Sequence, residues 1–553
     1  MDSWFPCKPS ALDRRAFLVS GALAATVAKA SLASQSAPQL ADAAGQRRVD
    51  AYGIRIGAAD RLQKTSWPLP VQNGDEARYP DKRASFSKTL PHNDVGEVEP
   101  AAYAAFVETM RGGTSDAFAR LPRALGALVR LNDPQAAFAF GFAGADSAAI
   151  PLGPPPAFAS AEMAAETAEL YWQALLVDTP FRRYESDPTV AAACHDLMAF
   201  SSARTGSRTP AVTPETLFRG DASGDLVGPY FSQFLWRDIP FGNKVIDQRY
   251  SFPSRDQHFL TDHDHWLACQ RGANPDTSIR YDGVPRYICS NREFVEFVHR
   301  DFSFQPYMNA ALIMLRLAAQ YGDDVLSPTN PYRGSRTQFG DITFGGKDML
   351  TLVAEASLAA QKAAYFQKWL VHRRLRPEVF GGRIEMHVAG LKRYDIHPDL
   401  LDCDGLQRSA ARVGSRLLPI AYPEGCPTHP SYPSAHAYNA GACAAVLKAF
   451  FNQDFPVPEP LQATDDGSAL EPWRGAPLTL GHEIDKLASN IAIGRQAAGV
   501  HYRSDSLNGL AAGEAVGIAL LVDHSVLYRE QFDGFVLARR DGRKVTIRQG
   551  SVL

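Results

Sequence analysis

The chain has 553 residues, with 57 Lys and Arg against 60 Asp and Glu, so its formal net charge is -3. With 45% hydrophobic and 21% charged residues it can bury a large core, which excludes intrinsic disorder, collagen-like repeats and a membrane transporter. The near-neutral balance also argues against a nucleic-acid partner, because general nucleic-acid binders are usually basic.

The N-terminal residues 1–33 have the pattern of an export signal. Arg14 and Arg15 precede a short apolar, Ala-rich run, and small residues over 28–33 suit signal cleavage. The pair followed by x-Phe-Leu resembles twin-arginine signals, although Asp13 stands where Ser or Thr is usual. The apolar run of about a dozen residues is shorter than the roughly 20 of a membrane-spanning helix, so a membrane anchor is the less favoured alternative. The sequence therefore predicts a bacterial exported protein, periplasmic or secreted, with no integral membrane segment.

Six cysteines remain after the expected signal. They contain no Cys-x-x-Cys pair, so a zinc cluster or a thioredoxin-like motif is not expected. An oxidising compartment would be compatible with one or two disulfides, but a chain of this size does not need them. The six are Cys194, Cys269, Cys289, Cys403, Cys426 and Cys443.

Long segments show the three- and four-residue spacing of apolar side chains that is typical of helices. Strand-like alternation is scarce, with a short exception at Lys544–Ile547, so we expect a mainly α protein built of packed helices. We divide the folded chain into an N-terminal helical region at 34–340 and a motif-bearing helical domain at 341–553. The predicted helices are Pro100–Arg111, Ala159–Leu176, Gln305–Tyr321, Met349–Leu375, Ser434–Phe451, Glu483–Gly499 and Ser506–Val522.

The first cluster of unusual residues contains Lys368 and Arg376, followed directly by Pro377. The spacing of the two cations is about 12 Å along a helix, with the side chains roughly 80° apart around its axis. Proline disfavours helix at the residue before it, so we expect the helix to end at Arg376. The two side chains could then converge on one anion, whereas a solvated basic face is the alternative for this cluster alone.

The second cluster places Ser434, Ala435 and His436 at the start of a predicted helix, shortly after His429. Ser434 suits the N-cap, with Ala435 and His436 in the first turn. The free N–H groups and the positive dipole end of such a turn form an anion site. Ser434 could instead act only as a cap, but capping needs neither imidazole.

The third cluster contains Arg495, His501 and Asp505. The guanidinium of Arg495 suits an oxyanion because its N–H groups form a planar fork. Asp505 is close enough to hold one ring nitrogen of His501, an arrangement typical of ligating histidines. A helix N-cap at Ser504 or Asp505, with His501 in the preceding turn, is the alternative.

Together, Lys-x7-Arg-Pro, Pro-Ser-Ala-His and Arg-x5-His-x3-Asp resemble the signature of the vanadium-dependent haloperoxidases, which type 2 phosphatidic acid phosphatases share. The usual middle motif has Gly where this chain has Ala435, which keeps the backbone donor but adds a methyl group. The segments 91–97, 132–138 and 228–242 look like bacterial relatives of the red-algal bromoperoxidases. The resemblance covers most of the chain and implies the helical-bundle fold of the haloperoxidases and type 2 acid phosphatases.

The resemblance implies that vanadate is held by Lys368, Arg376, Ser434, the backbone N–H of Ala435, and Arg495. His501 would be the single protein ligand of vanadium, with Asp505 supporting its ring. His436 would act as general acid or base, and His429 matches an additional histidine of the algal-type bromoperoxidases. Lys368 would also take part in catalysis by polarising the bound oxidant.

The implied activity is a haloperoxidase that uses hydrogen peroxide to oxidise bromide, and iodide, to a hypohalous acid equivalent that halogenates organic acceptors. Vanadate, as vanadium(V), would be the cofactor and act as a Lewis acid, and the family is compatible with structural calcium. One alternative is a phosphatase of the same superfamily that works through a phosphohistidine at His501. Another is a periplasmic oxyanion-binding protein without turnover, which would need the cations but not His429 and His436.

The resemblance also implies a homo-oligomer. The run Asp262-His263-Asp264-His265 offers four potential metal ligands, but they cannot all face one ion without an irregular loop. A polar surface loop is therefore the favoured interpretation of this run. His372 shares a helical face with Lys368, and a packed or exposed histidine is the favoured interpretation there.

Overall fold

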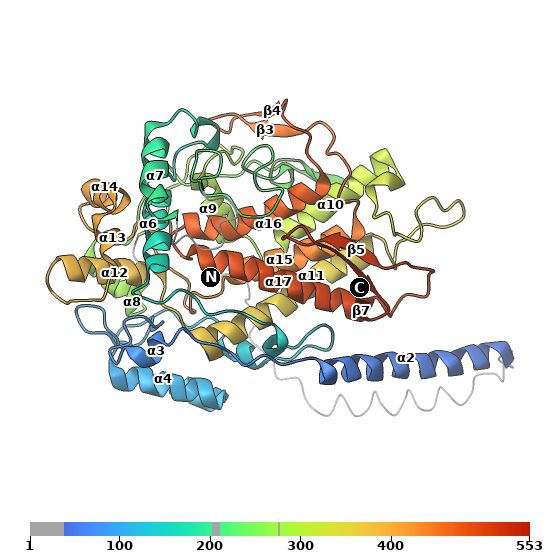
Figure 1. Ribbon diagram of the computed structural model, residues 1–553, viewed down its shortest axis with the longest axis horizontal. Helices are drawn as coiled ribbons and strands as arrows, with labels where there is room; N and C mark the ends of the chain where they lie inside the picture. Colours follow the sequence, from blue (N-terminus) through green and yellow to red (C-terminus); the bar gives the residue numbers. More distant parts are fainter. Residues whose placement is uncertain (1–37, 202–210, 275–276) are drawn as a thin grey trace, which may run out of the picture. The chain divides into compact units, whose positions relative to one another are not determined.

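The computed structural model describes three stretches of the chain: residues 38–201, 211–274 and 277–553 (Figure 1). The chain divides after Arg61 into two compact units. The described part of the first unit belongs to helix α2 (Pro38–Lys64), and the second unit is Leu62–Leu553. The predicted export signal at 1–33 lies outside the described residues. The predicted boundary near residue 340 stays a prediction.

Helices dominate the described chain, as the sequence predicts. The longer helices of the second unit are α4 (Pro100–Gly112), α6 (Ala161–Leu175), α7 (Pro188–Met198), α8 (His263–Gln270), α9 (Asn291–Arg300), α10 (Gln305–Tyr321), α11 (Gly346–Phe366), α12 (Pro377–Val388), α14 (Asp404–Val413), α15 (Ala435–Phe450), α16 (Leu480–Ala497) and α17 (Arg503–His524). The short ones are α3 (Asp75–Arg78), α5 (Ser115–Ala119), α13 (Pro398–Asp402), the 3-10 turns η1 (Pro134–Phe138), η2 (Ser147–Ala149), η3 (Phe181–Arg183), η5 (Gln233–Leu235) and η6 (Asp323–Val325), and the π-helical η7 (Gln367–His372).

The described strands are short and form three small antiparallel sheets. The strands are β1 (Ile239–Phe241), β2 (Lys244–Ile246), β3 (Leu461–Ala463), β4 (Leu470–Pro472), β5 (Phe535–Ala538), β6 (Lys544–Arg548) and β7 (Ser551–Val552). In register, Ile239 lies opposite Ile246, Leu461 opposite Pro472, and Phe535 opposite Ile547. The third sheet has the order β5-β6-β7. The predicted strand at Lys544–Ile547 is confirmed as β6.

The predicted helix over Met349–Leu375 is wrong in its last part. Helix α11 ends at Phe366, the chain continues as η7, and Arg373 adopts a left-handed conformation with φ 41°. Arg376 is then the N-cap residue of α12, whose first residue is Pro377. Proline is favoured there because its missing N–H would have no partner in the first turn. Pro377 therefore begins a helix rather than ending one.

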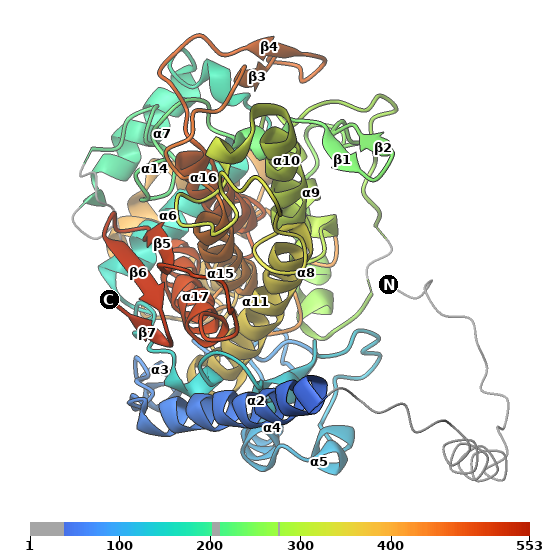
Figure 2. The same cartoon turned by 90° about the vertical axis from the view of Figure 1, so that its right-hand side faces the viewer.

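Helix α15 lies at the centre of the second unit (Figures 1 and 2). It packs along α17, α11 and α16, and all its residues over Ala437–Phe450 are buried. A helix that is apolar on all sides needs such a buried position. Ala437 of α15 belongs to one hydrophobic cluster, and Cys426 and Tyr502 belong to another.

Glycines let α15 and α17 approach each other closely. A Cβ on Gly441 of α15 would lie 2.1 Å from the carbonyl oxygen of Leu510. A Cβ on Gly513 of α17 would lie 2.1 Å from the carbonyl oxygen of Tyr438. Both distances are far below van der Waals contact, so only glycine fits at this spacing. Gly441 and Gly513, which we call the glycine seam, therefore fix how the N-terminal turns of the two helices face each other.

Helix α17 is long and apolar enough to cross a membrane by length and composition alone. However, 67% of its most apolar 18-residue window is buried inside the fold. Its polar residues are also paired, with Arg503 at 2.9 Å from Glu169 and Glu514 at 3.1 Å from Arg539. These features are typical of a core helix.

The six cysteines of the second unit are buried and free. The disulfides that the sequence allows are therefore absent from the described residues. Burial raises the pKa of thiols such as those of Cys426 and Cys443, so they stay uncharged.

Replacing Gly513→Ala should destabilise the fold, because its new Cβ would force α15 and α17 apart. Overpacking of this kind costs roughly 1–3 kcal/mol, so we expect a lower melting temperature in differential scanning calorimetry. Gly112→Ala is the matched control, since the space around its Cβ position is open. The control should melt at the wild-type temperature or slightly above it. Equal melting temperatures for the two variants would contradict the close glycine seam.

Candidate functional site

Two buried cations of the site lie on either side of Arg373, the left-handed residue that separates η7 from α12. Lys368 is fully buried, and its Nζ donates to the carbonyl oxygens of Pro430 at 2.8 Å and Ser431 at 2.9 Å. Arg376 is equally buried and donates from Nε to the carbonyl oxygen of His429 at 2.8 Å. Because the chain changes direction at Arg373 instead of continuing as one helix, both cations contact the segment 429–431.

Ser434 is the N-cap residue of α15, as the sequence predicts. Its Oγ accepts from the N–H of Ala437 at 3.4 Å, and its own N–H donates to the carbonyl oxygen of Asp505 at 2.9 Å. The N–H of Ala435 lies in the first turn, where no acceptor is available within the helix. This N–H and the positive end of the helix dipole favour an anion at the site.

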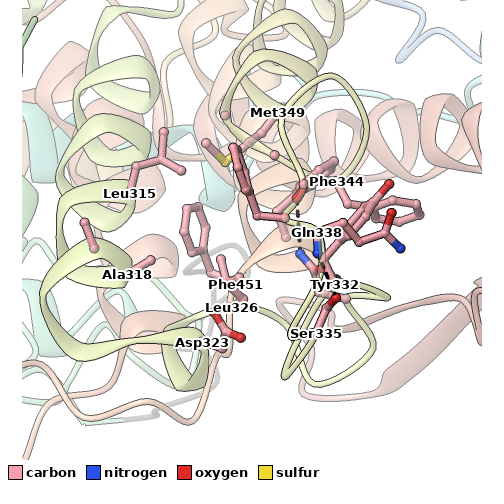
Figure 3. Close-up of a pocket in the computed structure, with 17 residues that line it drawn as sticks. Leu315, Ala318, Asp323, Leu326, Tyr332, Ser335, Gln338, Phe344, Met349 and Phe451 are labelled. Carbon is pink, nitrogen blue, oxygen red and sulfur yellow. Dashed lines mark hydrogen bonds between the residues drawn. The ribbon is translucent and has the colours of Figure 1, made fainter. Parts of the chain in front are cut away.

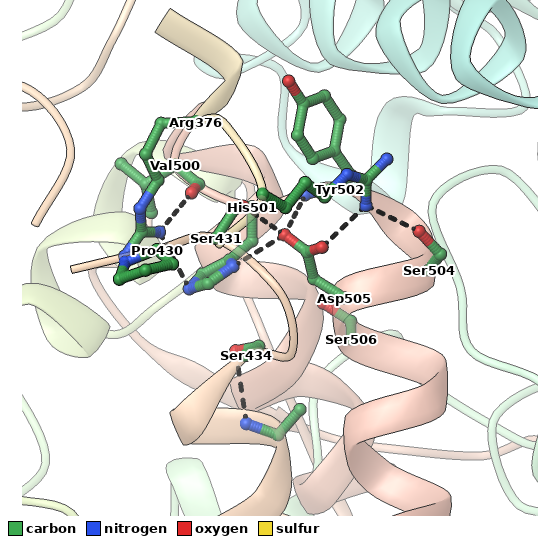
Figure 4. Close-up of polar contacts among 12 residues, drawn as sticks. Arg376, Pro430, Ser431, Ser434, Val500, His501, Tyr502, Ser504, Asp505 and Ser506 are labelled. Carbon is green, nitrogen blue, oxygen red and sulfur yellow. Dashed lines mark hydrogen bonds and ion pairs between the residues drawn. The ribbon is translucent and has the colours of Figure 1, made fainter. Parts of the chain in front are cut away.

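Asp505 holds the ring of His501 (Figure 4). Nδ1 lies 2.9 Å from Oδ2 of Asp505, so the ring donates from Nδ1 and keeps its lone pair on Nε2. Burial and the charge of Arg376 lower the pKa of His501 well below its usual range, so the ring is neutral. Nε2 faces Nη1 of Arg376 at 3.1 Å. A neutral imidazole with an oriented lone pair is the form that ligates a metal.

The carboxylate of Asp505 accepts further hydrogen bonds. Arg374 donates from Nη1 to Oδ1 at 2.7 Å, and the N–H of Tyr502 donates to Oδ2 at 3.0 Å. The hydroxyl of Ser431 also donates to Oδ2. Burial opposes the charge, but Arg374 and the hydrogen bond from His501 hold the pKa of Asp505 below its usual range. The carboxylate is therefore charged and engaged with its own partners.

Arg495 of α16 supplies the third cation. Its Nη1 donates to the carbonyl oxygen of Val298 at 2.7 Å and to the hydroxyl of Tyr422 at 3.2 Å. Its Nε is buried and has no hydrogen-bond partner among the described residues. This N–H is therefore free to donate to an acceptor that binds at the site.

The three cations share an unusual feature: none is ion-paired with a carboxylate in the described chain. Their acceptors are carbonyl oxygens, imidazole nitrogens and a hydroxyl. Burial and the charges of Arg376 and Arg495 lower the pKa of Lys368 well below its usual range. By contrast, the neighbouring Arg374 pairs with two carboxylates at 2.7 and 3.1 Å. Buried charge without a partner is costly, so the arrangement is suited to receive an anion.

His436 lies in the first turn of α15, and its side chain is 26% exposed. Its Nε2 is 3.1 Å from Oδ1 of Asp301, which follows α9. The other carboxylate oxygen of Asp301 is buried and has no hydrogen-bond partner among the described residues. An imidazole that reaches both solvent and a buried carboxylate can carry protons to a reaction centre.

His429 lies against Arg376. Its Nδ1 is 2.9 Å from Nη2 of Arg376, and its ring centroid is 5.6 Å from that of Tyr365. Burial and the charges of Lys368 and Arg376 lower the pKa of His429 well below its usual range. The ring is therefore neutral and adds no positive charge to the site.

Three residues that shape the site were not among the predicted ones. Arg374 joins the two carboxylates of Glu166 and Asp505, yet nothing in the sequence separates it from Arg373. Glu166 lies within an apolar stretch of α6, and this was the one signal that could have identified it. Asp301 follows a helix, as many acidic residues do, so its role at His436 has no sequence signal.

The run 262–265 and His372, which the sequence also offers as candidates, have structural roles. The predicted polar surface loop at 262–265 is wrong, because this run begins a helix: Asp262 caps α8 by accepting from the N–H of His265 at 2.8 Å. His372 is buried and packs edge-on against Tyr432, with ring centroids 4.8 Å apart. The described residues contain no group of three or more His, Cys, Asp or Glu placed to hold a metal ion. Structural calcium therefore stays a prediction.

A cavity of about 470 Å³ lies near the other end of α15 (Figure 3). Leu315, Phe344 and Phe451 are among the apolar side chains that line it. Phe450, at the end of α15, also lines it and lies about 24 Å along the helix from Ser434. The cavity is thus separate from the cationic site.

The fold and the site define a helical-bundle protein with a buried cluster of cations beside a histidine whose Nδ1 is held by a carboxylate. Comparison with known proteins identifies the class. A family model described as the VCPO second helical-bundle domain matches residues 411–528. The vanadium-dependent bromoperoxidase of Ascophyllum nodosum is 34% identical over 88% of this chain and 90% of its own length. That of Corallina pilulifera is 30% identical over 92% of this chain and 99% of its own.

A solved structure agrees with these sequence relatives. The homohexameric second vanadate-dependent bromoperoxidase of Ascophyllum nodosum has a TM-score of 0.86 and 27% identity, over 91% of this chain and 90% of that one. The chain belongs to the vanadium-dependent bromoperoxidase family. Its fold is the helical-bundle fold that the sequence predicts.

Asp505→Asn should destabilise the protein, because it removes one of the two carboxylates paired with Arg374 and the carboxylate that holds His501. Removing one partner of a buried ion pair costs roughly 3–5 kcal/mol, which thermal unfolding would show as a lower melting temperature. Since the pKa of Asp505 is lowered, its contribution is present above the unfolded value and is lost only as the pH falls through the folded value. The deficit should therefore be constant between about pH 5 and pH 9.

Asp541→Asn is the matched control for this substitution. Asp541 lies in an exposed turn and pairs with the exposed Arg543, so its replacement should change the melting temperature little. If Asp505→Asn proved as stable as this control, Asp505 would not be the charged centre of the site.

Proposed function

We propose that the protein is a vanadate-dependent haloperoxidase that uses hydrogen peroxide to oxidise bromide, and iodide, to a hypohalous acid equivalent. This product would halogenate organic acceptors. The proposal rests on one observation above all: Lys368, Arg376 and Arg495 are buried near each other without carboxylate partners, and Arg376 contacts the free nitrogen Nε2 of His501. The relatives are named bromoperoxidases, which supports bromide as the halide.

The cations fit an oxyanion such as vanadate. The buried Nε–H of Arg495 lacks an acceptor, and vanadate oxygens would provide one. Lys368 donates to neutral carbonyl oxygens, and Arg376 donates to carbonyl oxygens and neutral imidazoles. Charge-assisted hydrogen bonds to an oxyanion are stronger than these bonds, so they would compensate the burial of both cations.

The start of α15 and the pair of His501 and Asp505 supply the remaining groups proposed to bind vanadate. Ser434 can donate from its hydroxyl, and Ala435 from its backbone N–H at the positive end of α15. His501 would be the vanadium ligand through Nε2, because Asp505 already holds Nδ1. Bound vanadate supplies a Lewis-acid centre that activates hydrogen peroxide toward halide.

His436 is placed to handle the proton that the reaction consumes. Hydrogen peroxide, a halide ion and one proton together give hypohalous acid and water, so the site needs a proton donor. The ring of His436 is partly exposed and can take a proton from solvent, and Asp301 can stabilise the resulting imidazolium. Lys368 would place a positive charge next to the oxygen that the halide attacks.

The halide is assigned to the side of His429. This histidine is neutral and lies between Arg376 and Tyr365, so a halide there would meet the guanidinium and apolar ring surface. We propose bromide and iodide rather than chloride, on the basis of the bromoperoxidase relatives.

The proposal predicts bromination of phenol red when vanadate, hydrogen peroxide and bromide are supplied together. His501→Ala should abolish both the activity and the binding of vanadate, because it removes the only proposed protein ligand. His195→Ala, on the exposed surface of α7, is the control and should keep both. Activity would be followed by absorbance and bound vanadium by elemental analysis after dialysis.

The same assay separates the two alternatives. A phosphatase would release p-nitrophenol from p-nitrophenyl phosphate without vanadate and would not brominate phenol red. A binding protein would retain vanadate without bromination. Either result would contradict the haloperoxidase proposal.

We also propose that the protein is exported and forms a homo-oligomer. The Arg14-Arg15 pair and the apolar run after it support export by a twin-arginine route. The homohexameric structural relative supports an assembly of identical chains.

Replacing Arg14→Lys and Arg15→Lys together should retain the protein in the cytoplasm, because the twin-arginine route recognises the pair. Cell fractionation with an immunoblot against the full chain would measure this. Replacing Arg47→Lys and Arg48→Lys, a second arginine pair in α2, is the control and should leave export unchanged. Unaltered export of the first variant would contradict the assignment of the signal.

A further inference from the structure

The imidazole of His299, in the last turn of α9, lies beside the cationic site without belonging to it. Its ring stacks on that of Tyr422, with centroids 3.8 Å apart and planes inclined by 14°. The Tyr422 hydroxyl accepts from Nη1 of Arg495 at 3.2 Å and donates to the carbonyl oxygen of Val295 at 2.7 Å. Tyr422 therefore connects His299 to Arg495.

Both ring nitrogens of His299 face carboxylates. Nε2 lies 2.6 Å from Oε1 of Glu424, and Nδ1 lies 3.3 Å from Oε2 of Glu296. A neutral imidazole has one N–H, so its other nitrogen would turn a lone pair toward a carboxylate. Only the imidazolium donates to both. Burial opposes the charge, but Glu296 and Glu424 raise the pKa of His299.

The contact of Nε2 with Glu424 joins the two segments that hold Arg495. His299 and Glu296 both belong to α9, whose Val298 carbonyl oxygen accepts from Arg495 at 2.7 Å. Glu424 belongs to the loop that carries Tyr422, the second acceptor. If the ring lost its charge, one of its nitrogens would turn a lone pair toward a carboxylate, and the contact with Glu424 would lose its ion-pair character. The two acceptors of Arg495 would then be held less firmly at their present spacing.

We propose that His299, as an imidazolium between Glu296 and Glu424, positions Arg495 for the oxyanion and makes oxyanion affinity depend on pH. This inference rests on the proposed function, since it concerns the same oxyanion. His299 is a positioning residue, because it acts on the site only through Tyr422 and the end of α9.

The remaining charged groups around the ring favour this state. Arg300 donates to Oε1 of Glu296 at 3.0 Å, and the hydroxyl of Tyr281 donates to the same oxygen at 2.6 Å. Lys88 donates to the carbonyl oxygen of Glu424 at 3.0 Å. Burial opposes it, but these donors and the imidazolium lower the pKa of both carboxyl groups. The carboxylates therefore stay charged as the pH rises, and the imidazolium is the group that titrates.

The test is the affinity of the full chain, freed of vanadate, for orthovanadate in equilibrium dialysis. His299→Gln keeps a polar side chain but removes the charge, and we expect about tenfold weaker binding near pH 6.5. Since the pKa of His299 is raised, its contribution is present below the unfolded value and is lost as the pH rises through the folded one. The ratio of wild-type to variant affinity should thus fall toward one as the pH is raised. His195→Gln, on the exposed face of α7, should match the wild type at each pH.

Thermal unfolding checks that the variant is folded. If it is not, Glu424→Gln replaces it, because that side chain is 44% exposed and its loss removes one link of the imidazolium. We expect a smaller loss of affinity for this variant, and the ratio of wild-type to variant affinity should again fall as the pH rises. Equal affinities, or a ratio that stays constant as the pH changes, would overturn the inference. Failure of the wild type itself to bind orthovanadate would instead overturn the proposed function.

Discussion

The site depends on positive charge that the fold buries without neutralising. Most other buried cations of the described core have carboxylate partners, as Lys88 and Arg374 do. Lys368, Arg376 and Arg495 instead meet neutral acceptors, and the pKa of Lys368 is lowered by burial and by the other two charges. Such an arrangement costs free energy of folding unless an anion compensates it. Binding of the proposed oxyanion would therefore stabilise the fold, and ligand affinity and stability should rise together.

The fold holds this charge in place through two features. The glycine seam fixes the spacing of α15 and α17, so the first turn of α15 lies beside His501. Asp505 then links the separate segments, since it orients His501, pairs with Arg374 and accepts from the N–H of Tyr502. Because Asp505 is engaged with these donors, it fixes the ligand nitrogen without supplying a counter-charge for the three cations. The same group therefore gives rigidity and leaves the anion site open.

The sequence predicts the helices well, because their apolar spacing is a local property of the chain. It also predicts the Ser434 cap and the contact of His501 with Asp505, which lie within a few residues of each other. The break at Arg373 was not predictable in this way, because a left-handed residue between a π-helical turn and an extended segment depends on tertiary contacts. Asp301 was missed for the same reason: its partner lies on a different helix, far away in the sequence.

The most direct test of the account is a crystal structure of the full chain soaked in orthovanadate. We predict that vanadium binds to Nε2 of His501 and that Arg376 is released from that nitrogen. The oxygen atoms of the vanadate should contact Lys368, Arg376 and Arg495. The account would be contradicted if vanadium bound elsewhere, or if Arg376 kept its present contact with His501 and no vanadium was present.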